Sequence, residues 1–287
     1  MKKQFLYIAA ALLAMLVSVG CSSYSKLLKV NDSEQMYVAA LDYYRAGNFT
    51  RALELFEQIA PRYSGTMRAD SIMYFTGCSY YKQGDFMTSA EIFDTYRRTY
   101  GRSPMLEDVE YMYAMGFYFA APDAKRDQSS TRQAIAAISE YMSHYPESPK
   151  TALCEVRIEE LRQKLFEKSY INARTYYKTE RYKSAIIALR NALTDYPDTP
   201  YREEILYLTA VSCYRLADNS IASLQTDRFL DMMDAYYNFI SEFPDSNHRR
   251  ELDRMQRNAK NYLARHNAGR TDESSEPAAE QTNIINQ

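Results

Sequence analysis

Few residues in this chain have types and spacings that could do chemistry. There are 4 Cys and 3 His among 287 residues, no CxxC pair occurs and no nearby histidine suggests a metal, so no metal site is indicated. We expect the three histidines, His144, His248 and His266, to lie at helix ends or on the surface. Adjacent carboxylates such as Glu159 and Glu160 fall on charged stretches, where a solvated surface is the simpler interpretation than an acid–base pair.

The nucleophile motif GxSxG, the zinc-binding motif HExxH and the phosphate-binding motifs GxGxxG and P-loop are also missing from the sequence. We therefore expect no catalytic residue, no metal and no cofactor. The chain has 35 Lys and Arg residues and 37 Asp and Glu residues, so its formal net charge is −2. This charge does not favour nucleic acid as a partner.

Cys21 is the exception, because its context predicts a modification. Lys2 and Lys3 precede an uncharged apolar run, residues 5–19, that is shorter than the about 20 residues of a spanning helix. This pattern indicates a cleaved signal peptide over residues 1–20. The run ends in SVGC, which resembles a lipobox, so we expect Cys21 to be acylated; an ordinary signal peptide with an incidental cysteine is the alternative. The other cysteines, Cys78, Cys154 and Cys213, are interpreted as small apolar residues on helix faces.

The elements that carry these residues repeat along the chain. An aromatic residue is followed three places later by Ser or Thr in YSGT (63–66), YGRS (100–103), YPES (145–148), YPDT (196–199) and FPDS (243–246). Each marks a helix end and a restart, and Pro follows the Ser or Thr in three of them, as expected for an N-cap and the first helical position.

A constant apolar stripe precedes each of these aromatics. Seven residues earlier the chain has Phe56, Phe93, Ile138, Leu189 or Tyr236, and eleven residues earlier it has a mostly small residue. These spacings lie on one side of a helix, so the second helix of every unit is predicted to have the same length.

The first two units match at a shift of 37 residues and resemble tetratricopeptide repeats: Ala40, Tyr43, Gly47, Phe49, Ala52 and Phe56 correspond to Gly77, Tyr80, Gly84, Phe86, Ser89 and Phe93. In the fourth unit Glu180 replaces the turn glycine. The third and fifth units carry DAKRDQSS and DNSIASLQTD, for which enlarged turns are expected. Residues 150–178 contain neither Pro nor Gly and predict one long helix.

These patterns predict an all-α fold, a right-handed superhelix of five tetratricopeptide-like helix pairs with a C-terminal capping helix. The expected order is a signal peptide (1–20), a lipidated polar tether (21–32), repeats at about 33–66, 67–103, 104–148, 149–199 and 200–246, a capping helix (247–266) and a disordered tail (267–287).

Tyrosine is the candidate binding residue. The chain has 27 Tyr, and seven share one face of the first helices, which line the concave surface of such repeats: Tyr37, Tyr44, Tyr74, Tyr81, Tyr113, Tyr170 and Tyr177. They could form a groove for an extended polypeptide or fill the seams between repeats, and the sequence leaves both open.

The lipobox, the tether, the five irregular repeats and the YPxS/T signature together resemble the BamD (YfiO/ComL) family of outer-membrane assembly lipoproteins. The most specific matches are the YPESP, YPDTP and FPDS restarts, SSTRQAI in the third unit and YYKTERYKSAI in the fourth.

The resemblance implies a scaffold anchored in the outer membrane by its lipid alone and facing the periplasm. It implies that the N-terminal repeats bind unfolded outer-membrane protein precursors and that residues 150–266 dock on a BamA-like barrel subunit. Two alternatives remain: another periplasmic adaptor lipoprotein that coordinates envelope or peptidoglycan enzymes, and a SusD-like glycan-binding lipoprotein. The second is disfavoured because the chain has no Trp.

Overall fold

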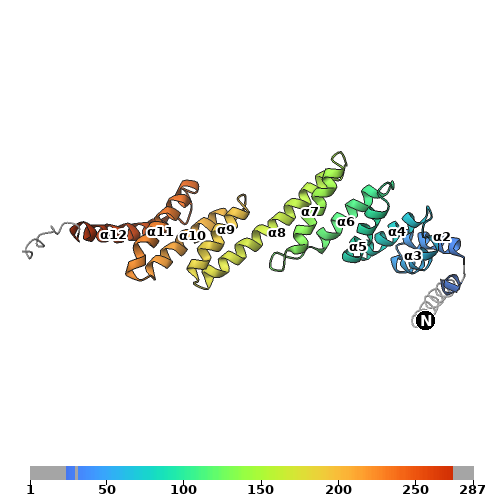
Figure 1. The fold of residues 1–287 in the computed structure, drawn as a ribbon, viewed down its shortest axis with the longest axis horizontal. Helices are drawn as coiled ribbons and strands as arrows, with labels where there is room; N and C mark the ends of the chain where they lie inside the picture. The colour runs from blue at the N-terminus through green and yellow to red at the C-terminus, as the bar shows by residue number, and fades with distance from the viewer. Residues whose placement is uncertain (1–23, 30–31, 274–287) are drawn as a thin grey trace, which may run out of the picture. The chain divides into compact units, whose positions relative to one another are not determined.

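The protein is all-helical over the residues that the computed structural model describes, 24–29 and 32–273, with the backbone alone described for 267–273 (Figure 1). No strand occurs in these ranges, so the predicted all-α fold built from helix pairs is confirmed there. The handedness of a superhelix stays a prediction. Cys21, the signal peptide and the last part of the expected tail lie outside the described residues. The chain divides into an N-terminal unit, Met1–Leu161, and a C-terminal unit, Arg162–Gln287.

In the N-terminal unit, each helix packs against the next one in the chain. The predicted apolar stripe forms the core of these pairs, because Phe56, Phe93 and Ile138 are completely buried. The helices are α2 (Ser33–Arg45), α3 (Phe49–Tyr63), α4 (Ala69–Gln83), α5 (Phe86–Thr99), α6 (Leu106–Ala120) and α7 (Ser129–His144).

Helix α8 (Thr151–Lys178) crosses from the first unit into the second and confirms the long helix expected for residues 150–178. The C-terminal unit continues with α9 (Tyr182–Asp195), α10 (Arg202–Asp218), α11 (Ala222–Glu242) and α12 (Arg249–Glu273). Its core includes Leu189, Met232 and Phe239, all completely buried.

Small residues allow the close helix approach that the tetratricopeptide pattern predicts. A Cβ atom added at Gly77 would lie 2.5 Å from the ring of Phe93 on the partner helix, so no other residue fits without movement. Gly47 and Gly84 adopt left-handed conformations in the turns, with φ of 76° and 82°. At the corresponding turn of the fourth pair, Glu180 adopts φ of 58° despite its side chain.

The five restarts share one hydrogen-bonding pattern. The amide of each Ser or Thr donates to the carbonyl of the aromatic residue three places earlier, and its hydroxyl accepts from the amide two places later at 3.0–3.3 Å. The expectation that Ser103 and Thr199 are the helix N-caps is wrong by two residues, since Met105 and Tyr201 occupy that position. The reason is a tighter turn, in which the amide of Leu106 donates to the carbonyl of Ser103 before the α-helix begins.

Three further expectations differ from the structure. Residues 24–29 are helical and pack on α2 and α3, whereas a polar tether was expected, because Tyr24, Leu27 and Leu28 are apolar enough to join that core. The DNSIASLQTD segment lengthens α11 rather than the turn before it, because it contains no Gly or Pro. Helix α12 reaches Glu273 instead of ending at residue 266, and the first proline beyond it is Pro277.

Candidate functional site

The tyrosines of α2 begin the candidate groove, and both rings contact neighbouring helices. The Tyr37 ring lies 6.4 Å from Phe56 and 6.2 Å from Tyr63, and the Arg68 guanidinium lies 4.9 Å from its centroid. The Tyr44 ring meets Phe49 at 5.5 Å and Phe75 at 5.0 Å, edge to face in both cases. These contacts join α2 to α3 and α4.

Three groups meet between α2 and α4. The buried Cys78 thiol belongs to the core cluster against which Tyr44 and Tyr74 pack, and it donates a hydrogen bond to the Met112 sulfur at 3.8 Å. Burial raises the pKa of Tyr44 to about 12 and that of Cys78 to about 12, and it raises the pKa of Tyr74 as well. The Cys78 thiol is therefore a protonated packing residue and not a reactive one.

Tyr81 and Tyr113 extend the row toward α6. The Tyr81 ring contacts Phe86 at 5.3 Å and Phe119 at 6.1 Å, and burial raises its pKa to about 12. The Tyr113 ring lies 5.0 Å from Phe117 and is covered by the Arg97 guanidinium at 4.4 Å. Phe119 is half exposed, so this end of the row has accessible aromatic surface.

The remaining two tyrosines belong to the C-terminal unit. The Tyr170 ring stacks on Tyr201 at 4.5 Å, and its hydroxyl donates to Glu204 at 3.5 Å. The Tyr177 ring lies 6.2 Å from Tyr182. The structure thus places five of the predicted tyrosines along α2, α4 and α6 in one unit and two in the other.

All seven rings have the same kind of environment. Tyr170 is buried and the other six are partly buried, so each has most of its surface against other helices and, except for Tyr170, a minor part open. Packing between helices accounts for the ring contacts, and the open edges are what a ligand could touch.

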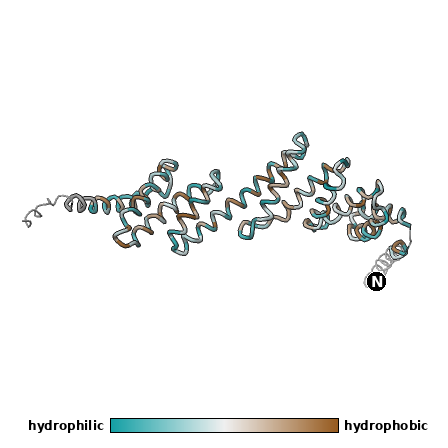
Figure 2. The backbone as a smooth tube through the Cα atoms, in the orientation of Figure 1, coloured by the Kyte–Doolittle hydropathy of each residue, from teal (hydrophilic) through white to brown (hydrophobic). Residues whose placement is uncertain are grey.

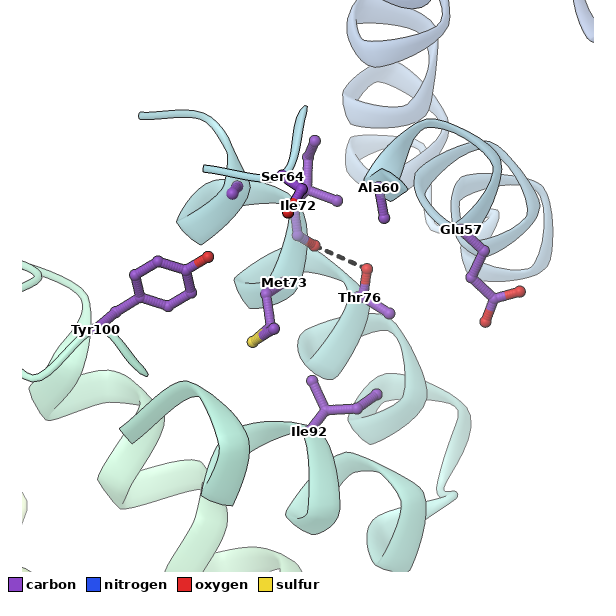
Figure 3. Close-up of a pocket in the computed structure, with 9 residues that line it drawn as sticks. Glu57, Ala60, Ser64, Ile72, Met73, Thr76, Ile92 and Tyr100 are labelled. Atoms are coloured by element: carbon purple, nitrogen blue, oxygen red, sulfur yellow. Dashed lines mark hydrogen bonds between the residues drawn. The ribbon is translucent and has the colours of Figure 1, made fainter. Parts of the chain in front are cut away.

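An apolar pocket of about 260 Å³ lies between α3, α4 and α5, and sequence reasoning missed it (Figure 3). Ile72, Met73 and Ile92 form its apolar wall, with Glu57 and Tyr100 at opposite sides. The pocket is built from residues on three helices, so no local sequence motif could have indicated it.

Tyrosine–carboxylate hydrogen bonds between neighbouring helices are a second feature that the sequence reasoning missed. They join Tyr63 to Glu34, Tyr80 to Glu57, Tyr141 to Glu107, Tyr207 to Glu251 and Tyr236 to Asp253. The two partners are separated by 17 to 44 residues along the chain, so no fixed spacing indicated these bonds.

His144 and His248 lie at a helix end or just before a helix, and His266 lies on the exposed surface within α12, so the expected end or surface positions are confirmed. His144 ends α7 and contacts the buried carboxylate of Glu110 at 2.7 Å, while His248 stacks on Tyr207 with ring centroids 3.9 Å apart. Within the described ranges no group of His, Cys, Asp and Glu is arranged to hold a metal ion. None of the helices described there is long and apolar enough to cross a membrane.

Comparison with protein families identifies the chain. The model of the YfiO family, described as "Outer membrane lipoprotein", matches residues 29–222 and 173–271, which together cover most of the sequence. The chain belongs to the YfiO family. It is accordingly an outer membrane lipoprotein of the BamD type, and its family role lies in the assembly machinery of that membrane.

This YfiO-family member was also compared with curated proteins and with solved structures. No curated protein matches the chain. Among solved structures, the TPR2AB-domain:pHSP90 complex of yeast Sti1 is similar over 79% of this chain and 98% of its own, with 12% sequence identity and a TM-score of 0.36.

Proposed function

We propose that this lipoprotein is a non-catalytic scaffold that binds unfolded outer-membrane protein precursors and docks on the BamA-like barrel subunit from the periplasmic side of the outer membrane. Its YfiO-family match is the observation that carries this proposal. In this proposal the helix pairs bind and orient the precursor, and the barrel subunit inserts it into the membrane.

The N-terminal unit is proposed to bind the precursor. The accessible edges of Tyr37, Tyr44, Tyr74 and Tyr81 form a row beside α2 and α4, and half-exposed Phe119 continues it. Aromatic edges with hydroxyls suit an extended polypeptide, because they bury apolar side chains and can hydrogen bond to its backbone. Tyr113 on α6 belongs to the same proposed surface, whereas Tyr170 and Tyr177 lie in the C-terminal unit.

Site-specific photocrosslinking tests the precursor surface. A photoreactive benzoylphenylalanine replaces Tyr37 in the full-length lipoprotein, and an unfolded outer-membrane protein is added in urea-diluted form. We expect a crosslinked adduct at Tyr37 and little at Glu91, which is exposed on the second-helix side of the same unit. Equal crosslinking at the two positions would mean that binding does not use the tyrosine row.

Residues 150–266 are proposed to dock on the barrel subunit. The support is the regional assignment implied by the family, together with a well-packed core from α9 to α12 that can present a rigid surface. Capture of the barrel subunit by the tagged lipoprotein from solubilised membranes tests this assignment. Absence of the barrel subunit from the captured material would refute the docking role.

A further inference from the structure

Residues 24–29 dock on the first helix pair, α2 and α3, and we call them the anchor segment because Cys21 precedes Tyr24 by three residues. The segment is helical, and Tyr24, Leu27 and Leu28 form one apolar side that joins the core of α2 and α3. Figure 2 shows hydrophobic positions of these two helices in brown and hydrophilic positions in teal. The exposed residues of the segment are Ser25, Lys26 and Lys29.

Tyr24 fixes one end of the anchor segment to the α2–α3 turn. Its ring packs edge to face on Tyr43 at 5.4 Å, and the Arg51 guanidinium lies 4.9 Å from the ring centroid. Its hydroxyl donates to the Glu54 carboxylate, and only 9% of the residue is exposed. Tyr43 belongs to the last turn of α2 and Arg51 to the first turn of α3, so Tyr24 lies beside the turn that joins these helices.

The anchor segment runs along α3, away from that turn. The Gln58 side-chain amide donates to the Leu28 carbonyl at 3.4 Å, whereas Tyr24 bonds to Glu54, four residues earlier in α3. Contacts at both ends therefore fix the direction of the segment as well as its position. The chain between Cys21 and Tyr24 spans at most about 11 Å whatever its conformation, so an anchor at Cys21 is held near the α2–α3 turn.

An undocked tether would leave the helix pair far more freedom. Eleven residues, 22–32, could span up to about 36 Å, and the pair could then face the membrane in any orientation. The docked contacts remove most of that reach. Two exposed basic side chains, Lys26 and Arg45, lie toward the turn end, where phospholipid phosphates attract positive charge; Arg45 also pairs with exposed Asp42 at 3.2 Å.

We propose that the anchor segment holds acylated Cys21 at the α2–α3 turn, so that this end of the first helix pair, with Lys26 and Arg45, lies on the phospholipid surface of the membrane. The opposite end of the pair, at the α3–α4 loop, is then up to about 22 Å farther from that surface, because α3 has 15 residues. This placement rests on the lipid anchor alone and is independent of the precursor-binding and docking roles.

Quenching by lipid headgroups tests the orientation. A fluorescent coumarin amino acid replaces Ala46 at the end of α2 or Met67 in the α3–α4 loop, both of which are exposed. The acylated full-length lipoprotein is reconstituted on vesicles of phosphatidylethanolamine and phosphatidylglycerol that contain a phospholipid with a nitroxide on its headgroup. We expect quenching at position 46 to exceed quenching at position 67 at least about threefold, because the nitroxide acts at short range and the length of α3 separates the two probes.

Release of the anchor segment, with a matched control, tests its role. Tyr24→Ala/Leu27→Ala removes two packed side chains, and Ser25→Ala/Lys29→Ala removes two exposed side chains of the same segment. The difference in quenching between the two probe positions should fall to less than about half in the first variant, because the tether regains its reach, and persist in the second. Circular dichroism checks that both variants fold.

A second design leaves every packed residue in place. A flexible linker of about 12 Gly and Ser residues, inserted between Ser23 and Tyr24, adds about 19 Å of root-mean-square reach and should also reduce quenching at position 46. The same linker inserted between Ala279 and Glu280, far along the chain from the anchor, should leave that quenching unchanged.

The outcomes separate this placement from the lipid anchor itself. Equal quenching at positions 46 and 67 without other changes, or quenching at position 46 that neither segment release nor the N-terminal linker reduces, overturns the placement and leaves the anchor intact. A chain that does not bind the vesicles, with Cys21 unmodified in mass spectrometry, overturns the anchor and the placement with it.

Discussion

Replacing Tyr44 and Tyr81 together by alanine removes two rings that join neighbouring helix pairs. The Tyr44 ring contacts Phe49 and Phe75, and the Tyr81 ring contacts Phe86 and Phe119. A fully buried aromatic ring costs about 3–5 kcal/mol on truncation to alanine, and these rings are only partly buried, so we take about 2 kcal/mol each. The double variant should lose about 4 kcal/mol of the free energy of unfolding.

This loss is large enough to see in thermal unfolding. For a unit of this size, Met1–Leu161, 1 kcal/mol corresponds to about 2–4 °C, so the melting temperature should fall by about 8–16 °C. Circular dichroism of the purified chain gives the melting curve, and photocrosslinking to an unfolded precursor is measured at a temperature where the variant is still folded.

Two controls separate the loss of a packed ring from the loss of a hydroxyl and from the loss of an exposed ring. Tyr44→Phe/Tyr81→Phe keeps both rings, and Tyr176→Ala removes a ring that is 40% exposed, so both should melt within about 3 °C of the wild type. An unchanged melting temperature in the double alanine variant, with precursor crosslinking lost, would refute the packing role and leave the tyrosine row as a ligand surface alone.

Four further predictions follow from the structure. Glu180→Gly should stabilise the C-terminal unit by about 1 kcal/mol in chemical denaturation, because glycine adopts the left-handed turn conformation without strain, and a destabilised variant would contradict this. Gly77→Leu should destabilise the N-terminal unit by at least about 2 kcal/mol, since even a Cβ lies 2.5 Å from Phe93, and Phe93→Ala in the same chain should recover part of that loss. The free energy of unfolding should fall as pH rises from about 9 to 12: Tyr44 and Cys78 have ordinary pKa values of 10.0 and 9.0 and folded values of about 12, so the folded state holds their protons longer and is stabilised fully only below the ordinary values. Alkaline titration with tyrosine absorbance and circular dichroism checks this, and ionisation of every tyrosine without loss of helix would contradict it. Cys21→Ala should release the chain from the membrane fraction, because the acylation site is lost. Unchanged membrane association of this variant would count against the lipobox.

The repetitive part of this fold was predictable from local sequence. The aromatic and Ser/Thr restarts mark the boundaries of the helix pairs, and the stripe ending in Phe56 and Phe93 gives the buried side of each second helix. The long helix α8 followed from the lack of Pro and Gly over residues 150–178. These features depend on spacings within one or two helices, which the sequence displays directly.

The parts that could not be predicted depend on contacts between helices. The Tyr44 ring on α2 packs edge to face on Phe75 of α4, and the pocket at Met73 needs residues of three helices. The docked segment at Tyr24 was expected to be a tether, because polar neighbours masked its apolar residues.

Affinity capture tests the central claim most directly. The tagged lipoprotein is purified from detergent-solubilised membranes of its own organism, and the captured proteins are identified by mass spectrometry. An assembly scaffold should recover a large barrel protein with periplasmic domains in near-stoichiometric amounts. Recovery of peptidoglycan enzymes without that barrel protein would contradict the assignment.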